Sequence, residues 1–200
     1  MIKNQEITIE ELTLPQKKVD SAPIPFLQLT EDIDIKNRKI YVTNIDVYTP
    51  AFIQQRADVI YQMSGDDTTP LTLSISSFGG DAYAMFGIVD VMKLLPSKVN
   101  TLGVGTAQSA AATLLVAGTG QRTITENTFV MIHQISTWLG GQADDIAVEA
   151  KHTKELQTKL YKLLASKSKK PADFWKKQTK SNLYLPAEKC LEYGLVDVVI

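Results

Sequence analysis

Several features that mark other classes of protein are scarce or absent in this sequence. The 200 residues include one cysteine, Cys190, so no disulfide can form within the chain, and we expect the protein in a reducing compartment, the cytoplasm. No apolar run reaches the roughly 18 residues that span a bilayer, and the first residues lack the apolar stretch of a signal peptide. The formal net charge of −1 gives no reason to expect nucleic acid or a membrane as a partner.

Histidine is also scarce, with only His133 and His152. A reaction that needs a base titrating near neutrality therefore has two histidine candidates. His152 lies in AKHTKEL, and its lysine and glutamate neighbours are typical of a solvent-exposed helix. His133 ends the apolar segment TFVMIH, where it can be either a satisfied core residue or a side chain that faces a cleft. No HExxH motif or cysteine–histidine cluster is present, so we expect no metal or cofactor.

The composition is that of one folded domain. With 44% hydrophobic and 22% charged residues, a chain of this length can bury a sizeable core. Residues 1–25 are polar and contain three prolines, which predicts a flexible N-terminal arm, although their alternating apolar residues would also suit a strand at a sheet edge. Residues 26–200 are predicted to form a single domain.

Strand and helix patterns alternate through this domain. Strands are predicted at 39–45, 71–76, 99–105, 121–125, 128–133 and 196–200. Helices are predicted from Thr49 as an N-cap before Pro50, over 82–95, 109–118, about 141–165 and 186–193, with a short helix before a turn at 182–186. This alternation argues for an α/β fold with a largely parallel sheet and helices outside it. The helix at about 141–165 is predicted to be amphipathic and can project from its own sheet.

Ser109 stands between a predicted strand and a predicted helix. A serine at this position is most often an N-cap. The same position also suits a nucleophile, because N–H groups at a helix start can stabilise an oxyanion and small neighbours such as Ala107 and Ala110 let a substrate approach. The segment is not a G-x-S-x-G elbow, since Ala111 occupies the second position after the serine.

The segment SSFGGD follows another predicted strand. Its two glycines can form a plain turn. Alternatively, the Gly79 N–H donates to an oxyanion, with the Ala110 N–H as the second donor, and the adjacent extended backbone binds a peptide strand.

Together, these stretches resemble the ClpP family of self-compartmentalising serine peptidases over about residues 68 to 200. SISSFGGDAYAMFGIVDVM is similar to the family's glycine-glycine turn, GVGTAQSAAATLLVAG to its nucleophile segment, FVMIHQ to its histidine segment and LPAEKCLEYGLVDVVI to its C-terminal signature. The resemblance implies a serine endopeptidase with Ser109 as nucleophile and His133 as general base. It places Asn182 where the family has the aspartate of its triad.

The resemblance further implies a ClpP/crotonase-like fold of repeated β-β-α units and a homo-oligomer. The helix at about 141–165 would be a handle between two heptameric rings, stacked as a tetradecamer. An AAA+ unfoldase such as ClpX or ClpA would feed unfolded polypeptide into the enclosed chamber. A groove of the Clp type would favour apolar or small side chains at the cut.

The chain departs from the family at Asn182. An amide can accept a hydrogen bond from His133, but it cannot stabilise the imidazolium by charge. Three arrangements stay open: a triad supported by asparagine, a Ser-His dyad, and a catalytically impaired subunit. Asp144 or Asp145 would be a substitute third member, although both stand at the start of the predicted handle.

Other departures concern the turn and the partners. Phe78 replaces a proline of the family's turn, and Ser181 replaces an arginine that the family uses between rings. Thr72 and Ser74 occupy positions where the family has aromatic residues that dock the unfoldase. Because apolar anchors dominate such docking, these replacements predict weaker or altered partner choice.

Three function classes follow from the sequence. The first is an ATP-dependent compartment peptidase. The second is a crotonase-like acyl-CoA hydratase or isomerase, which shares the backbone oxyanion hole but typically uses carboxylates as acid and base, unlike the pairing of Ser109 and His133. The third is a catalytically impaired ring component with a regulatory or assembly role, which Asn182 favours.

Overall fold

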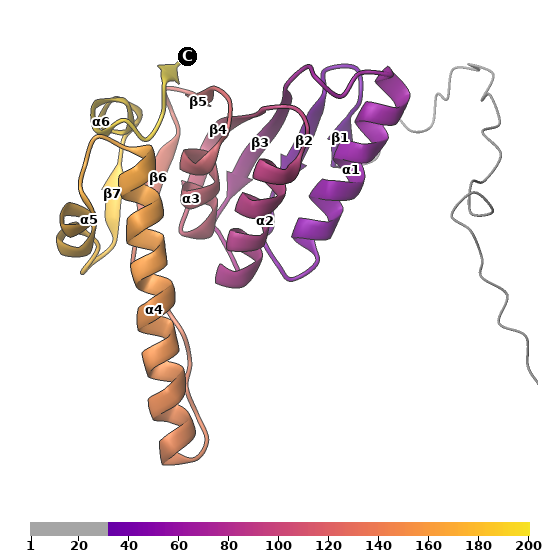
Figure 1. Cartoon of the computed structure of the whole chain (residues 1–200). Coiled ribbons are helices and arrows are strands. Elements are labelled where there is room, and N and C mark those ends of the chain that lie inside the picture. Colours follow the sequence, from indigo (N-terminus) through magenta and orange to yellow (C-terminus); the bar gives the residue numbers. More distant parts are fainter. Residues whose placement is uncertain (1–31) are drawn as a thin grey trace, which may run out of the picture.

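A computed structural model of the chain describes residues 32–200 (Figure 1). The predicted N-terminal arm lies outside the described residues. The strands are β1 (Ile33–Asp34), β2 (Lys39–Val42), β3 (Leu71–Ser77), β4 (Val99–Gln108), β5 (Arg122–Ile124), β6 (Phe129–Ile132), β7 (Leu183–Leu185) and β8 (Val198–Val199). The helices are α1 (Thr49–Ser64), α2 (Ala82–Leu94), α3 (Ala110–Ala117), α4 (Ala143–Lys167), α5 (Ala172–Gln178) and α6 (Ala187–Tyr193).

Within the described residues, the strands form one eight-stranded sheet that branches at β4. The main path runs β1-β2-β3-β4-β5-β8, while β6 pairs with β4 and β7 pairs with β6. All pairings are parallel except β1–β2 and β6–β7. The start of β4 pairs with β5 and its last residues pair with β6, and Gly105 lies between the two halves at φ 73°. The predicted α/β fold with a largely parallel sheet is therefore confirmed.

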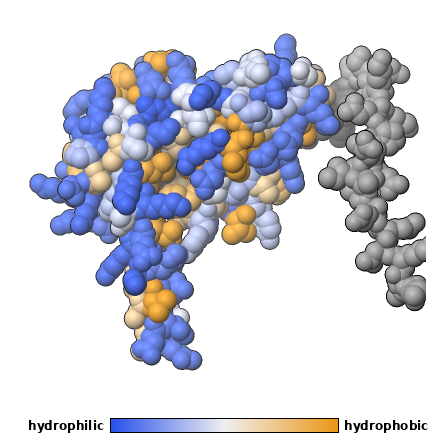
Figure 2. All heavy atoms as spheres, in the orientation of Figure 1, coloured by the Kyte–Doolittle hydropathy of each residue, from blue (hydrophilic) through white to orange (hydrophobic). Residues whose placement is uncertain are grey.

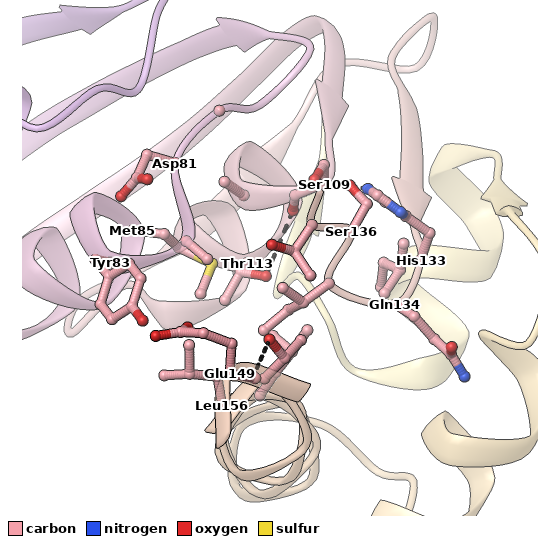
Figure 3. Close-up of a pocket in the computed structure, with 18 residues that line it drawn as sticks. Asp81, Tyr83, Met85, Ser109, Thr113, His133, Gln134, Ser136, Glu149 and Leu156 are labelled. Carbon is pink, nitrogen blue, oxygen red and sulfur yellow. Dashed lines mark hydrogen bonds between the residues drawn. The ribbon is translucent and has the colours of Figure 1, made fainter. Parts of the chain in front are cut away.

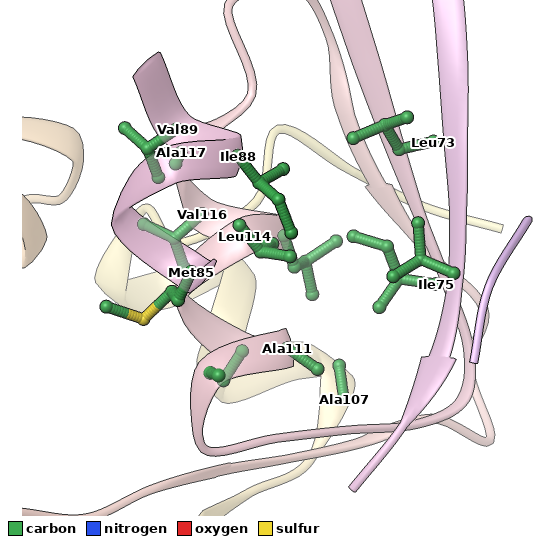
Figure 4. Packing of buried hydrophobic residues seen from close by; sticks show 14 of the residues in the cluster. Leu73, Ile75, Met85, Ile88, Val89, Ala107, Ala111, Leu114, Val116 and Ala117 are labelled. Atoms are coloured by element: carbon green, nitrogen blue, oxygen red, sulfur yellow. The ribbon is translucent and has the colours of Figure 1, made fainter. Parts of the chain in front are cut away.

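Three helices cover one face of the sheet. α1, α2 and α3 lie side by side, and α3 is buried along its whole length (Figure 1). Figure 4 shows Ile88 of α2 and Leu114 of α3 beside Leu73 and Ile75 of β3, all of them fully buried. Burial of such a side chain stabilises the fold by about 1.5–3 kcal/mol. The core therefore fixes the position of the α3 N-terminus, where Ser109 stands.

The long helix α4 projects from the body (Figure 1). Near its C-terminal end, Leu160, Tyr161 and Leu164 are buried in the core, whereas residues 143–149 are all exposed. The predicted projection and approximate bounds are thus confirmed. Ile146, at the projecting end, is exposed. Within residues 32–200, no helix is both long and apolar enough to cross a bilayer.

Two local predictions are corrected. The segment predicted as a turn at 182–186 contains the strand β7, because an antiparallel ladder with β6 satisfies its backbone. Thr49 is the first residue of α1 rather than its cap. Its N–H and that of Tyr48 both donate to the Asp46 carboxylate, so Asp46 takes over the role expected of a capping side chain.

Candidate active site

Ser109 occupies a strained turn between β4 and α3. Its backbone dihedrals are φ 54° and ψ −121°, which non-glycine residues rarely adopt and which cost on the order of 1–3 kcal/mol. The hydrogen bond from its N–H to the Met131 carbonyl, at 2.7 Å, ties the turn to β6. The side chain makes no capping hydrogen bond, so the N-cap interpretation is wrong for the hydroxyl. A serine on a sharp strand-to-helix turn has the backbone form of a nucleophile elbow, although the motif itself is absent.

His133 directly follows β6, which runs parallel to the last residues of β4. Because Gln108 is paired with Met131, the two strands end at the same edge of the sheet, and Ser109 and His133 both extend beyond it. The His133 Nε2 atom lies 2.7 Å from Ser109 Oγ (Figure 3). With the ring proton on Nδ1, Nε2 accepts the Ser109 hydroxyl. The structure therefore brings together the predicted nucleophile and base within hydrogen-bonding distance.

The surroundings of His133 favour its neutral form. Its ring is half-buried, and burial lowers its pKa below the ordinary value. Near neutral pH the ring is therefore uncharged and able to accept a proton. The second histidine, His152, is exposed on α4, where it stacks on Tyr83 with ring centroids 6.0 Å apart. The prediction that His152 is a surface residue is confirmed.

Asn182 stands opposite His133 in the register of the backbone, but its side chain makes no hydrogen bond with the His133 ring. The β6–β7 ladder pairs Ile132 with Leu183, and one further step of the same register puts His133 opposite Asn182. In residues 32–200, the only hydrogen bond of the His133 ring is with Ser109. Asp144 and Asp145 occupy the first turn of α4, at its far end from the body, so the structure does not bring either to His133 (Figure 1).

The glycine-glycine turn packs directly against the nucleophile. Gly79 has φ +110°, and a Cβ there would lie 2.8 Å from Ser109 Cβ, so only glycine fits. Its N–H, the predicted oxyanion donor, instead donates to Ser77 Oγ at 3.1 Å. The Gly80 N–H has no acceptor in the described part of the chain, and Gly80 lines the cavity beside Ser109 and Ala110. Sequence reasoning missed Gly80, whose only signal was its place as the second glycine of the pair.

Ala110 stays a predicted oxyanion donor. It opens α3, where the first backbone N–H groups have no partner within the helix. Together with Ser109 it lines a cavity of about 260 Å³ between the starts of α2 and α3, the segment 132–137 and the handle α4 (Figure 3). The site thus has a serine, a neutral histidine, free backbone donors and an adjoining cavity, which together can perform acyl transfer.

Comparison with known proteins agrees with this chemistry. The family model described as Clp protease matches residues 30–200. A relative from Porphyromonas gingivalis, named ATP-dependent Clp protease proteolytic subunit, is 36% identical over 159 residues, which cover 79% of this chain and 71% of the relative. A relative of the same name from Bacteroides thetaiotaomicron has the same identity and coverage. A relative from Salinibacter ruber, named ATP-dependent Clp protease proteolytic subunit 1, is 36% identical over 145 residues, which cover 72% of this chain and 62% of the relative. The chain therefore belongs to the Clp protease family and is a serine peptidase of the Clp type.

Proposed function

We propose that this chain is the proteolytic subunit of an ATP-dependent Clp protease and that it hydrolyses peptide bonds of unfolded polypeptides through an acyl-enzyme on Ser109. The observation that carries the proposal is the 2.7 Å contact between Ser109 Oγ and His133 Nε2 at a strained strand-to-helix turn. The serine is held in a rare backbone conformation, and its hydroxyl is hydrogen-bonded to an imidazole instead of capping its own helix. This arrangement suits nucleophilic attack.

The reaction proceeds in two halves. The Ser109 oxygen attacks the peptide carbonyl while His133 Nε2 takes its proton. The tetrahedral intermediate then collapses, and the imidazolium gives that proton to the leaving amine. Water, deprotonated by His133, attacks the ester and releases the acid. The Ala110 N–H and a glycine N–H stabilise the oxyanion in both halves. We assign the glycine donor to Gly80, since the Gly79 N–H is occupied by Ser77.

Asn182 is proposed as the third member of the site. The β6–β7 register supports this role, since it carries the asparagine to the position opposite His133. In this role its amide oxygen would accept the Nδ1–H and hold the ring. The catalytically impaired ring component is the second candidate, and the absence of that hydrogen bond favours it. The relatives, named as proteolytic subunits, favour the peptidase.

The assembly is proposed to be a pair of stacked heptameric rings in the cytoplasm. The projecting α4 supports it, because residues 143–148 are exposed and nothing among residues 32–200 covers them, so they suit contact with another subunit. An AAA+ unfoldase such as ClpX or ClpA is the proposed ATP-driven partner. Thr72 and Ser74 are partly exposed on β3, and their polar side chains predict weaker docking than aromatic residues would give. Ser181 is exposed beside Asn182 and offers no charge for a contact between rings.

A fluorophosphonate probe tests the proposal directly. We expect the purified protein to be labelled at Ser109, as located by mass spectrometry, and Ser109→Ala and heat-denatured protein to remain unlabelled. Ser136→Ala is the matched control, because Ser136 lines the same cavity without contacting His133, and it should label like the wild type. A folded oligomer that the probe leaves unlabelled would contradict the peptidase and support the impaired ring component.

A further inference from the structure

The cavity beside Ser109 is placed to receive a substrate side chain. Ser109 and Ala110 line it together with Gly80, so it adjoins the position that the attacked carbonyl would occupy. A pocket at that point holds the side chain of the residue that supplies the carbonyl, on the acyl side of the cleaved bond. Its shape and charge therefore contribute to the choice of cleavage site.

The walls of this cavity change character along its length. Ser109 and His133 lie at one end, and Tyr83 and Glu149 lie at the other (Figure 3). Met85, Leu156 and Leu160 add apolar surface to the lining. A side chain that fits this arrangement has a long apolar stem and a polar end, as lysine and arginine do.

The charged groups of the lining are acidic. Asp81 and Glu149 line the cavity, and no lysine or arginine from residues 32–200 does. The carboxylate of Asp81 accepts the Ala84 N–H at 2.7 Å and so caps α2. The carboxylate of Glu149 takes part in no ion pair or hydrogen bond among residues 32–200, where only its backbone carbonyl accepts a bond, from Thr153. Glu149 is exposed, so the far end of the cavity opens to solvent and holds a carboxylate that is free to pair with a cation from the substrate.

We propose that this cavity binds a lysine or arginine side chain on the acyl side of the cleaved bond, with Glu149 as its counter-ion. The inference rests on the proposed role of Ser109 as nucleophile. It differs from the preference for apolar or small residues that a Clp-type groove implies. The stem of the substrate side chain lies along Met85 and Leu156, and its charge meets Glu149 beside the hydroxyl of Tyr83. A carboxylate at the end of a specificity pocket is also how trypsin-type serine peptidases select basic residues.

Binding to Ser109→Ala tests the pocket without requiring turnover. Two fluorescent peptides are compared that differ only in their C-terminal residue, which is lysine in one and norleucine in the other. Norleucine has the apolar stem of lysine without its charge. Fluorescence anisotropy gives the dissociation constant of each peptide. We expect the lysine peptide to bind about threefold to fivefold more tightly, as an ion pair at an exposed carboxylate implies, and this preference to shrink at high salt. Adding Glu149→Gln should abolish the preference while leaving the norleucine peptide within about twofold.

A matched variant on the same helix separates local from general charge effects. Glu155→Gln removes an exposed carboxylate that does not line the cavity, and it should leave the preference intact. Equal affinities for the two peptides, no measurable binding of the lysine peptide, or equal weakening of both by Glu149→Gln would overturn the pocket assignment. If instead the proposed function is wrong, the fluorophosphonate will leave Ser109 of the wild-type protein unlabelled.

Discussion

His133 is held in place by the backbone on one side and by Ser109 on the other. β6 carries it between β4 and β7, and its Nε2 contacts the serine at 2.7 Å. Nothing in the described part of the chain accepts a hydrogen bond from Nδ1. The tautomer and orientation of an imidazole depend on the partner of its second nitrogen, so a hydrogen-bond acceptor at Nδ1 would improve the base.

Replacing Asn182 by aspartate should increase the reactivity of Ser109. A carboxylate opposite His133 would accept the Nδ1–H and stabilise the imidazolium that forms during attack. We expect fluorophosphonate labelling of Asn182→Asp to be about 10- to 100-fold faster than that of the wild type. This gain is smaller than the factor of about 10⁴ that the reverse change costs in a chymotrypsin-type triad, because the β6–β7 ladder already positions the ring.

Ser181→Asp is the control for this change. It adds the same charge one residue earlier, and successive side chains of an extended segment point to opposite sides. It should label at the wild-type rate. Equal rates for the wild type and Asn182→Asp would show that position 182 does not serve the histidine and would favour the Ser-His dyad.

The pH dependence of labelling reports the burial of His133. Only the neutral ring accepts a proton, so reactivity is lost as the ring becomes protonated. Burial disfavours the charged form and lowers the pKa, so the midpoint should lie below the ordinary 6.5, with full reactivity retained at neutral pH. The check is the rate of Ser109 labelling from acid to neutral pH at constant ionic strength. A midpoint at or above 6.5 would contradict this, and in Asn182→Asp the midpoint should move upward.

The sequence allowed Ser109 and His133 to be singled out, but not the geometry of the turn. Four motifs in the right order carried the resemblance, and two histidines left few candidates for a base. The positive φ of Ser109 has no local sequence signal, because it depends on the bond from its N–H to the Met131 carbonyl, far along the chain. The Gly79 N–H is occupied by Ser77, two residues earlier, whereas the position of Gly80 depends on a bridge to Ile45, far away in the sequence.

At the scale of elements, the branched strand β4 organises the site. Its first half pairs with β5 and closes the body, while its end pairs with β6 and brings His133 beside Ser109. Periodicity predicted β3, β4 and α2 well, because apolar residues face one another across the core. It missed β7, a three-residue strand with Pro186 directly after it, because its strand form comes from pairing with β6.

At the scale of the whole molecule, the handle carries apolar surface that nothing else in residues 32–200 covers. Figure 2 shows apolar side chains near the far end of the projecting helix, and the exposed ones there are Trp138, Leu139, Ile146 and Val148. The rest of this end is polar, with Asp144 and Asp145 in its first turn. An apolar patch with a polar rim is typical of a surface that another subunit covers.

Placing charge on this patch should divide the assembly without unfolding the subunit. Val148 is 66% exposed and Ile146 is 36% exposed, so glutamates at both positions stay solvated in the single chain but would be desolvated in a contact between rings. We expect light scattering on Ile146→Glu/Val148→Glu to give half the wild-type mass, with a melting temperature of the subunit within a few degrees of the wild type. Thr158→Glu, an exposed change nearer the body, should keep the full mass. An unchanged mass in the double variant would mean that the tip of α4 does not join the rings. If the wild-type protein itself has the mass of a single ring, Ser181 and its neighbours leave the two rings unconnected.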